Sequence, residues 1–267
     1  MTADTNSTAA FYDEMWQSWG ALESGSPAAS HRRRWLLKLI RQHAPRAERV
    51  LEVGCGQGAL LRSLGCALPR AALSGADVSE ASLAIARAAC PTAEFFALDL
   101  AAPDFEQRQG ARAGSFELIV CSEVLEHLTD DRSALVRLRW LLAPGGHLVV
   151  SVPAGQQTRF DRAIGHVRHY DEAMLRQRLV GAGFELDTSL AWGFPFHTLY
   201  RLVVRVAARL TLERAGGAPQ PSPLLALGYR AFGSLLKPLY YLNRPYWGEQ
   251  LFAVAHRSAG RGREPGA

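Results

Sequence analysis

Residues 50–58 read VLEVGCGQG, an apolar run that passes directly into three closely spaced glycines. The run Arg49–Gly54 predicts a short buried strand, and Gln57–Leu64 has the pattern of a helix. Glycine lets the backbone pass close to a bound molecule, and the N-terminus of the following helix offers unpaired N–H groups. The stretch therefore predicts a strand–turn–helix unit that binds a ligand at its turn.

Further apolar strands alternate with helices on the C-terminal side of this unit. The expected strands are Ala72–Ala76, Glu94–Leu98, Phe116–Cys121, His147–Val152, Phe184–Leu190 and Gly248–His256, and the expected helices are Glu80–Ala89, Asp131–Leu142 and Asp171–Gly181. Ser79 can cap the helix that follows it. Strands this apolar are covered on both faces, which is typical of parallel, doubly wound sheets. The fold class is therefore α/β, with a Rossmann-like sheet of seven strands.

The rest of the chain divides around this core. We expect an N-terminal helical lid, a cofactor-binding core, a helical substrate or cover lobe inserted before the last strand, the last strand itself and a disordered tail. Their expected bounds are residues 1–44, 45–192, 193–247, 248–257 and 258–267. The insertion is too long for a plain loop, and the tail is rich in glycine, arginine and proline.

Glu52 is an acidic residue in the otherwise apolar first strand. Gly54, Gly56 and Ala59 loosely satisfy the dinucleotide fingerprint, so a nicotinamide-dependent oxidoreductase is one alternative. Such an enzyme binds a pyrophosphate at this turn, and a nearby carboxylate would repel it. A cofactor with a cationic centre would instead be attracted, so Glu52 argues against the oxidoreductase.

Two more acids follow the next two strands. Asp77 ends the second strand, where a carboxylate can bind ribose hydroxyls. Asp99 ends the third strand, where a carboxylate can accept a hydrogen bond from an adenine amino group. Three acids at one edge of the sheet suit a nucleoside that carries positive charge and no phosphate.

These motifs, taken in order, resemble those of class I S-adenosylmethionine-dependent methyltransferases. The similar stretches are VLEVGCGQG at 50–58, GADVS at 75–79, ALDL at 97–100, FELIVCSEVLEHL at 116–128 and PGGHLVVSVP at 144–153. The resemblance covers residues 45–190 and implies S-adenosyl-L-methionine as cofactor. It places Glu52, Gly54, Gly56 and Gly58 around the methionine moiety, Asp77 at the ribose, Asp99 and Leu100 at the adenine, and Ser122 and Glu123 on the far side.

The element Glu123-Val124-Leu125-Glu126-His127 is open to two interpretations. It resembles the ExxEH element of ubiquinone-biosynthesis O-methyltransferases and of small-RNA 2′-O-methyltransferases, where it can hold a divalent cation. Many metal-free members share EVLEHL, with the histidine packed at a helix start. We expect no metal site.

The stretch Gly165-His166-Val167-Arg168-His169-Tyr170-Asp171 follows the fifth strand, where substrates of such sheets lie. It resembles a GHxRxY element of small-molecule methyltransferases. We expect His166 or His169 to act as the base that deprotonates an acceptor hydroxyl, and Arg168 to bind an acidic substrate group. The structural alternative is a salt-bridged loop that orders the helix beginning at Asp171.

The inserted lobe contains two helical stripes. One is apolar, with Leu199, Leu202, Val203, Val206 and Leu210, and the other is basic, with Arg201, Arg205 and Arg209. The favoured interpretation is a cover packed on the sheet. The alternatives are an apolar wall for an acyl or aromatic acceptor, with the aromatic run 240–247, or a peripheral membrane contact through 199–242.

The chain has 267 residues and a formal net charge of +5, and its densest basic run is Arg32-Arg33-Arg34. We interpret this run as the solvated face of a helix, so DNA is not an expected partner. Without a secretory signal or a long apolar stretch, the expected location is the cytoplasm. The leading function is methylation of a small-molecule hydroxyl. The alternatives are an RNA or nucleotide methyltransferase, disfavoured because no RNA-binding module is appended, and a non-catalytic cofactor-binding or membrane-associated scaffold.

Overall fold

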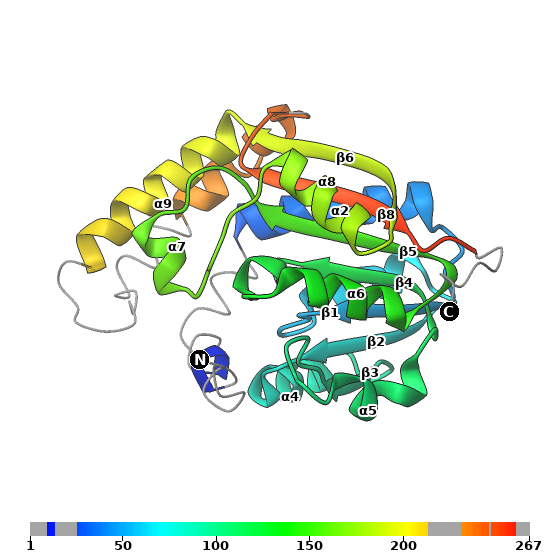
Figure 1. Ribbon diagram of the computed structural model, residues 1–267. Helices are drawn as coiled ribbons and strands as arrows, with labels where there is room; N and C mark the ends of the chain where they lie inside the picture. The colour runs from blue at the N-terminus through cyan, green and yellow to red at the C-terminus, as the bar shows by residue number, and fades with distance from the viewer. Residues whose placement is uncertain (1–9, 14–25, 213–230, 246, 260–267) are drawn as a thin grey trace.

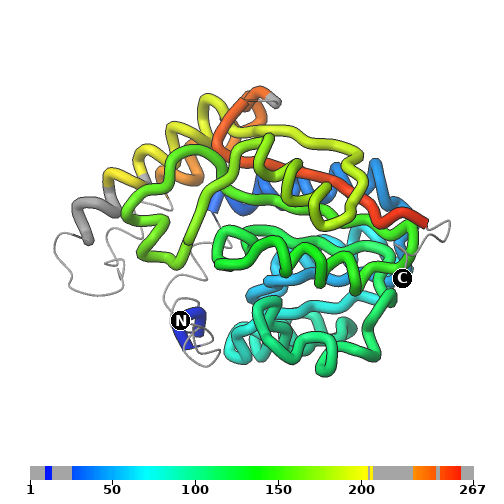
Figure 2. Tube along the Cα trace, viewed as in Figure 1, coloured from blue at the N-terminus to red at the C-terminus, as the bar shows by residue number. Residues whose placement is uncertain are grey.

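The computed structural model describes residues 10–13, 26–212, 231–245 and 247–259. Figure 1 shows these residues as a central sheet with helices on both sides, and Figure 2 traces the same path of the chain. Residues 10–13 are helical. The remainder of the expected lid before residue 26 and the tail from residue 260 lie outside the described residues.

An eight-stranded sheet runs through the molecule in the order β3-β2-β1-β4-β5-β8-β6-β7. The strands are β1 (Arg49–Val53), β2 (Ala72–Asp77), β3 (Glu94–Ala97), β4 (Phe116–Ser122), β5 (Leu142–Pro153), β6 (Glu185–Phe194), β7 (Arg244–Pro245) and β8 (Gln250–His256). The expected Rossmann-like sheet of seven main strands is confirmed, and β7 adds a two-residue strand at its edge.

The first five strands are parallel, as expected, but β8 is antiparallel to both of its neighbours, β5 and β6. The inserted lobe explains this difference. Trp192 near the end of β6 pairs with Gln250 at the start of β8, so the lobe leaves and re-enters the sheet at one edge. Strand β8 must therefore run antiparallel to β6.

Helices cover both faces of the sheet. They are α2 (Pro27–His43), α3 (Ala59–Ala67), α4 (Glu80–Ala89), α5 (Phe105–Gln109), α6 (Asp131–Leu141), α7 (Arg159–Ala163), α8 (Glu172–Gly181) and α9 (Phe196–Leu212). In Figure 1, α6 and α8 lie in front of the sheet and α2 behind it. Leu135 and Leu175 belong to the core on one face, and Leu36 and Leu61 to the core on the other. Burying each such leucine stabilises the fold by about 1.5–3 kcal/mol.

Local sequence sets several helix starts. The Ser79 hydroxyl accepts a hydrogen bond from the Ser82 N–H, which confirms the expected cap of α4. Asp171 caps α8 in the same way through the Met174 N–H. Ser26 caps α2 with Pro27 at its first turn, where the missing proline N–H costs nothing.

The inserted lobe corrects one expectation. In α9 the apolar residues Leu199, Leu202, Val203 and Val206 are exposed rather than packed on the sheet. Arg201 and Arg205 face inward instead, because Glu249 and Asp161 offer them carboxylate partners there. The side chains of Arg209 and Leu210 are not among those described. None of the helices in the described part of the chain has the length and apolarity that crossing a bilayer requires.

Candidate active site

The glycine turn lies where β1 ends beside β2 and β4. Gly54 adopts a left-handed conformation with φ 71°, and a Cβ at this position would lie 2.3 Å from the Val124 Cγ2 atom. Only glycine fits so close to the neighbouring loop. Gly58 precedes α3 without a side-chain cap, so the first N–H groups of α3, apart from that of Leu61 beside Glu52, remain open to a ligand.

Asp77 joins this turn to the next helix. Its carboxylate accepts hydrogen bonds from the Gly56 N–H at 2.8 Å and from the Ser79 N–H at 3.0 Å. Burial raises the pKa of this carboxyl, and the two backbone N–H groups counteract the rise. Each carboxylate oxygen has a second lone pair, so Asp77 can still accept from a ligand hydroxyl.

Glu52 provides a direct test of cofactor fit. Its side chain is buried in β1, and its Oε2 atom has no hydrogen-bond partner within the described residues. Burial and the nearby Asp77 raise the pKa of this carboxyl. A buried acceptor without a donor is costly unless a ligand supplies one. An amino or cationic group at the turn would do so, and S-adenosylmethionine carries both.

The adenine side of the predicted site follows β3. The Asp99 carboxylate accepts a hydrogen bond from the Ala101 N–H at 2.7 Å, and Leu100 is buried in the core. The pairing of Asp77 with Ala97 places Asp99 beyond the same edge of the sheet as Asp77. The structure thus brings the acids of the first three strands to one edge.

Glu123 has φ 56°, which is rare for a residue with a side chain and costs of order 1–3 kcal/mol. Its Oε1 atom accepts hydrogen bonds from Gln250 at 2.8 Å and from Ser151 at 3.3 Å, and its Oε2 atom lies 3.5 Å from an Arg32 nitrogen. The Ser122 hydroxyl bonds the Ser151 hydroxyl at 2.8 Å. These contacts hold Glu123 in its strained conformation at the end of β4.

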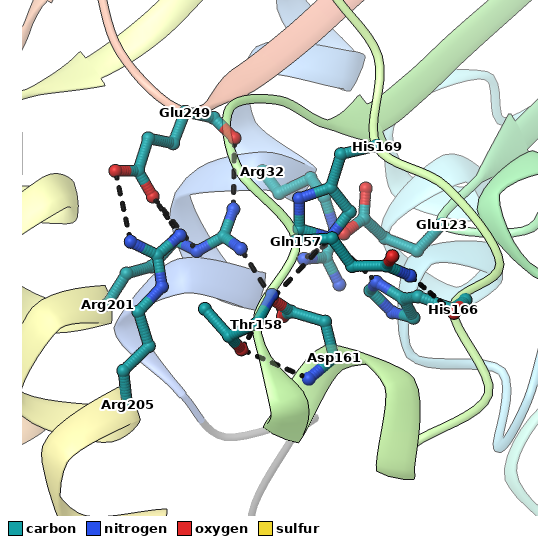
Figure 3. A network of polar contacts seen from close by, with 10 residues as sticks. All are labelled: Arg32, Glu123, Gln157, Thr158, Asp161, His166, His169, Arg201, Arg205 and Glu249. Atoms are coloured by element: carbon teal, nitrogen blue, oxygen red, sulfur yellow. Dashed lines mark hydrogen bonds and ion pairs between the residues drawn. The ribbon is translucent and has the colours of Figure 1, made fainter.

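Close to Glu123, the imidazole rings of His166 and His169 lie in a row with the carboxylate of Asp161 (Figure 3). His166 Nδ1 lies 3.1 Å from His169 Nε2, and that atom lies 3.7 Å from an Asp161 oxygen. The ring of His127 meets the ring of His166 edge-on at 4.7 Å between centroids. Burial, with smaller effects of His127 and His169, lowers the pKa of His166 to about 3. The imidazole is therefore neutral at pH 7.

Arg168, which we expected to bind a substrate group, is held by contacts with neighbouring residues. Its guanidinium donates to the carbonyls of Leu128 and Thr129 and lies 3.3 Å from Asp131. Tyr170 donates its hydroxyl to the same Asp131 carboxylate at 2.9 Å. The carboxylate thus fixes the two residues on either side of His169. The structural alternative, a salt-bridged loop, describes these two side chains.

Sequence reasoning missed a group of charged residues around the histidines. Arg32 was interpreted as solvated, but it contacts Glu123 because α2 packs against β5. From α9, Arg201 lies 3.5 Å from Asp161 and 3.3 Å from Glu249, and Arg205 lies 2.7 Å from Glu249. Asp161 had a local signal, since it forms a capping box with Thr158 at the start of α7.

Residues 10–13 lie against both parts of the site. The Ser79 hydroxyl donates to the Asp13 carboxylate, and the Tyr12 ring meets the His127 ring at 5.4 Å. Burial, Glu126 and Asp77 together raise the pKa of Tyr12. The proximity of one phenol to these two carboxyls puts residues 10–13 between the glycine turn and the histidines.

Glu126, His127 and His166 offer three ligand atoms within 4.8 Å of one another. The Glu126 carboxyl is buried, neither oxygen is hydrogen-bonded to another described residue, and burial with the charge of Glu123 raises its pKa. Carboxylate and imidazole ligands suit Mn²⁺ or Zn²⁺. Asp161, His166 and His169 are equally close, but the hydrogen bond between the two rings occupies their facing nitrogens.

The partly buried histidines of the site predict that acid destabilises the fold. The folded pKa is about 3 for His166 and about 4 for His127, against about 6.5 in an unfolded chain. The unfolded state binds more protons between these values, so the free energy of unfolding falls as pH drops below 6.5, by on the order of 1–2 kcal/mol per histidine at pH 5. The raised pKa values of Glu52 and Glu126 act in the opposite direction. Urea unfolding at pH 7 and pH 5 measures the difference.

The matched variant for this prediction is His127→Gln/His166→Gln, which cannot take up these protons. It should lose less stability between pH 7 and pH 5 than the unmodified protein. An equal loss in both proteins would show that other groups control the acid response.

Comparisons with known proteins identify the family of the chain. A family model described as a methyltransferase domain matches residues 28–189, more than half of the chain. The chain is similar to the ubiquinone biosynthesis O-methyltransferase of Acinetobacter baylyi, at 32% identity over 117 residues, 43% of this chain and 48% of that protein. It is also similar to the trans-aconitate 2-methyltransferase of Variovorax paradoxus, at 33% identity over 177 residues, 64% of this chain and 62% of that protein. The matches thus span less than two thirds of either relative.

A solved structure with the same fold is phosphoethanolamine N-methyltransferase 2 of Haemonchus contortus in complex with S-adenosyl-L-methionine. The TM-score is 0.56 at 15% identity, covering 84% of this chain and 52% of that one. The family match, the glycine turn and the unpartnered buried oxygen of Glu52 agree on the cofactor. The chain belongs to the class I S-adenosylmethionine-dependent methyltransferases.

Proposed function

We propose that the protein transfers a methyl group from S-adenosylmethionine to a hydroxyl oxygen of a small-molecule acceptor. The observation that carries this proposal is the partly buried imidazole of His166, which is hydrogen-bonded to His169, whose Nε2 atom lies 3.7 Å from Asp161. An acceptor hydroxyl needs a base to remove its proton, whereas amine or carbon acceptors need less help. A dedicated imidazole pair therefore favours oxygen.

The cofactor half of the site, which consists of the residues at the ends of β1 to β4, binds and orients the cofactor. Glu52 accepts a hydrogen bond from its amino group, the Asp77 carboxylate accepts from the ribose, and Asp99 accepts from the adenine amino group. The open N–H groups of α3 and the positive-φ glycines allow close approach of the methionine moiety. Leu100 packs against the adenine, and Ser122 and Glu123 border the cofactor from β4. Bound S-adenosylmethionine supplies an electrophilic methyl group.

The acceptor half of the site, which contains His166 and His169, removes one proton from the acceptor hydroxyl. In the tautomer in which His166 donates from Nδ1 to His169, the Nε2 atom of His166 has a free lone pair. Nε2 takes the hydroxyl proton as the oxygen–methyl bond forms and the sulfur–methyl bond breaks, which leaves S-adenosylhomocysteine. The positive charge on the imidazoles is stabilised by Asp161, which Arg201 holds in place. Positioning at near-attack distance supplies up to about 7–11 kcal/mol of the barrier reduction.

Acceptor screening tests the choice of oxygen. The purified protein is incubated with methyl-labelled S-adenosylmethionine and paired compounds that differ only in a free or a blocked hydroxyl. Label should appear in the hydroxyl compound of an active pair and not in its blocked partner. Label in both partners, or only in amine-bearing compounds, would contradict transfer to oxygen. Absence of any methyl transfer, with cofactor binding intact, would favour the scaffold alternative.

A second candidate is a metal-assisted methyltransferase of RNA or nucleotides, which the triad Glu126, His127 and His166 favours. Burial disfavours the ionised form of the Glu126 carboxyl, and a divalent cation there would stabilise that form. The test is calorimetry with Mn²⁺, beside the variant Glu126→Gln, and turnover after chelation. Micromolar Mn²⁺ binding that Glu126→Gln abolishes, together with activity lost on chelation, would establish the metal site. No binding and unaffected turnover would exclude it.

A further inference from the structure

Helix α9 has an inverted distribution of charged and apolar side chains. Surface helices normally turn apolar residues toward the core and charged residues toward water. In α9 the inward residues include Arg201 and Arg205, whose side chains are only 14% and 23% exposed, beside the buried Tyr200 and His197. The outward residues form the α9 apolar face, which consists of Leu199, Leu202, Val203 and Val206, each 39–53% exposed. Their spacing of three and four puts all four on one side of the helix.

Exposed apolar side chains are concentrated in this part of the molecule. Nine of the fourteen large exposed hydrophobic residues in the described chain lie between 194 and 247, although these residues are a small part of it. They include Tyr241, Leu242 and Trp247, the last with 67% exposure. Tyrosine and tryptophan are the residues that favour the interface between lipid and water. Isolated exposed leucines are ordinary, but such a concentration marks an interaction surface.

Exposed basic residues lie on α7, which contacts α9, and elsewhere in the lobe that contains α9. Helix α7 packs against α9, and both of its arginines, Arg159 and Arg162, are exposed. Lys237 and Arg244, beyond α9 in the same lobe, are exposed as well. The neighbouring acids, Asp161 and Glu249, already face Arg201 and Arg205 on the inner side. These exposed basic side chains suit an anionic partner.

We propose that the α9 apolar face docks on an anionic lipid bilayer, with α9 lying in the plane of the interface. Apolar burial and attraction between the arginines and lipid headgroups act together in such contacts. This proposal does not depend on methyl transfer, because none of the residues in the α9 apolar face belongs to the proposed catalytic or cofactor-binding groups. Arg201 of the same helix contacts Asp161, so docking brings the histidine cluster near the bilayer surface.

Vesicle co-sedimentation tests the proposal. The full chain is mixed with phosphatidylcholine vesicles that either contain or lack phosphatidylglycerol, and the bound fraction is measured. The variant is Leu202→Asp/Val206→Asp. The matched control is Ile85→Asp/Val136→Asp, which adds the same charge at two equally exposed helix positions, on α4 and α6. Circular dichroism verifies that each variant is folded.

The proposal predicts binding to the anionic vesicles only, weakened by salt. The α9 variant should bind at least about tenfold more weakly than the unmodified protein, and the control within about twofold of it. No binding to anionic vesicles would overturn the proposal, as would equal binding by the α9 variant and the control. A dimer in solution that the α9 variant dissociates, without vesicle binding, would overturn it in favour of a second copy of the chain as the occupant.

Discussion

Replacing His166 with alanine lowers the turnover number by about 10²–10⁴-fold, the range expected when a general base is lost. Affinity for S-adenosylhomocysteine should stay within about twofold, because His166 lies in the acceptor half of the site. His169→Ala removes the ring that is hydrogen-bonded to His166 Nδ1 and should cost at least about tenfold. Single-turnover kinetics with an active acceptor measures both effects.

The control is His256→Ala. It removes an imidazole on β8 that pairs with Asp187 of β6, outside the group of His127, His166 and His169. It should leave turnover unchanged. Unchanged turnover in His166→Ala and His169→Ala would remove the base from the proposed mechanism. A parallel loss of cofactor affinity in either variant would instead show that the ring supports the cofactor half of the site.

Replacing Asp131 with alanine should lower the free energy of unfolding by about 3–5 kcal/mol. The Asp131 carboxylate is buried and pairs with Arg168 and with Arg178, and it also accepts the Tyr170 hydroxyl. Its removal takes one carboxylate acceptor from two partly buried guanidinium groups and from one buried hydroxyl. Because the network orders the loop that carries His166, turnover should fall as well. Urea unfolding measures the stability change.

An exposed pair provides the comparison for this prediction. Asp104 and Arg108 form an ion pair on α5 at 2.7 Å, and both side chains are largely exposed. Asp104→Ala should cost less than about 1 kcal/mol, because water screens exposed pairs. If Asp131→Ala were as mild as Asp104→Ala, the network would contribute little to stability, and the loop around His166 would be ordered by other contacts.

Elements governed by neighbouring residues could be predicted from the sequence. The helix Glu80–Ala89 has the predicted bounds, and the Ser79 hydroxyl caps its first turn. The glycine turn was equally clear, since Gly54 must have a positive φ and cannot carry a side chain beside Val124. Alternating strands and helices then allow only a few sheet topologies.

Contacts between distant segments could not be predicted in this way. Arg32 is 91 positions from Glu123, and whether it faces water or the site depends on how α2 packs on the sheet. The orientation of α9 could not be predicted, because its amphipathic pattern fits either side. Only the positions of Asp161 and Glu249 decide that its arginines turn inward. The antiparallel direction of β8 likewise depends on the path of the inserted lobe.

The central claim is that the glycine turn and its acids bind S-adenosylmethionine. The most direct measurement is titration calorimetry of the protein with S-adenosylhomocysteine, beside Asp77→Ala and a parallel titration with NAD⁺. The account predicts micromolar binding of S-adenosylhomocysteine, weakened roughly 10- to 100-fold in Asp77→Ala by the loss of charge-assisted hydrogen bonds, and no binding of NAD⁺. Binding of NAD⁺ in place of S-adenosylhomocysteine, or equal affinity in Asp77→Ala, would contradict it.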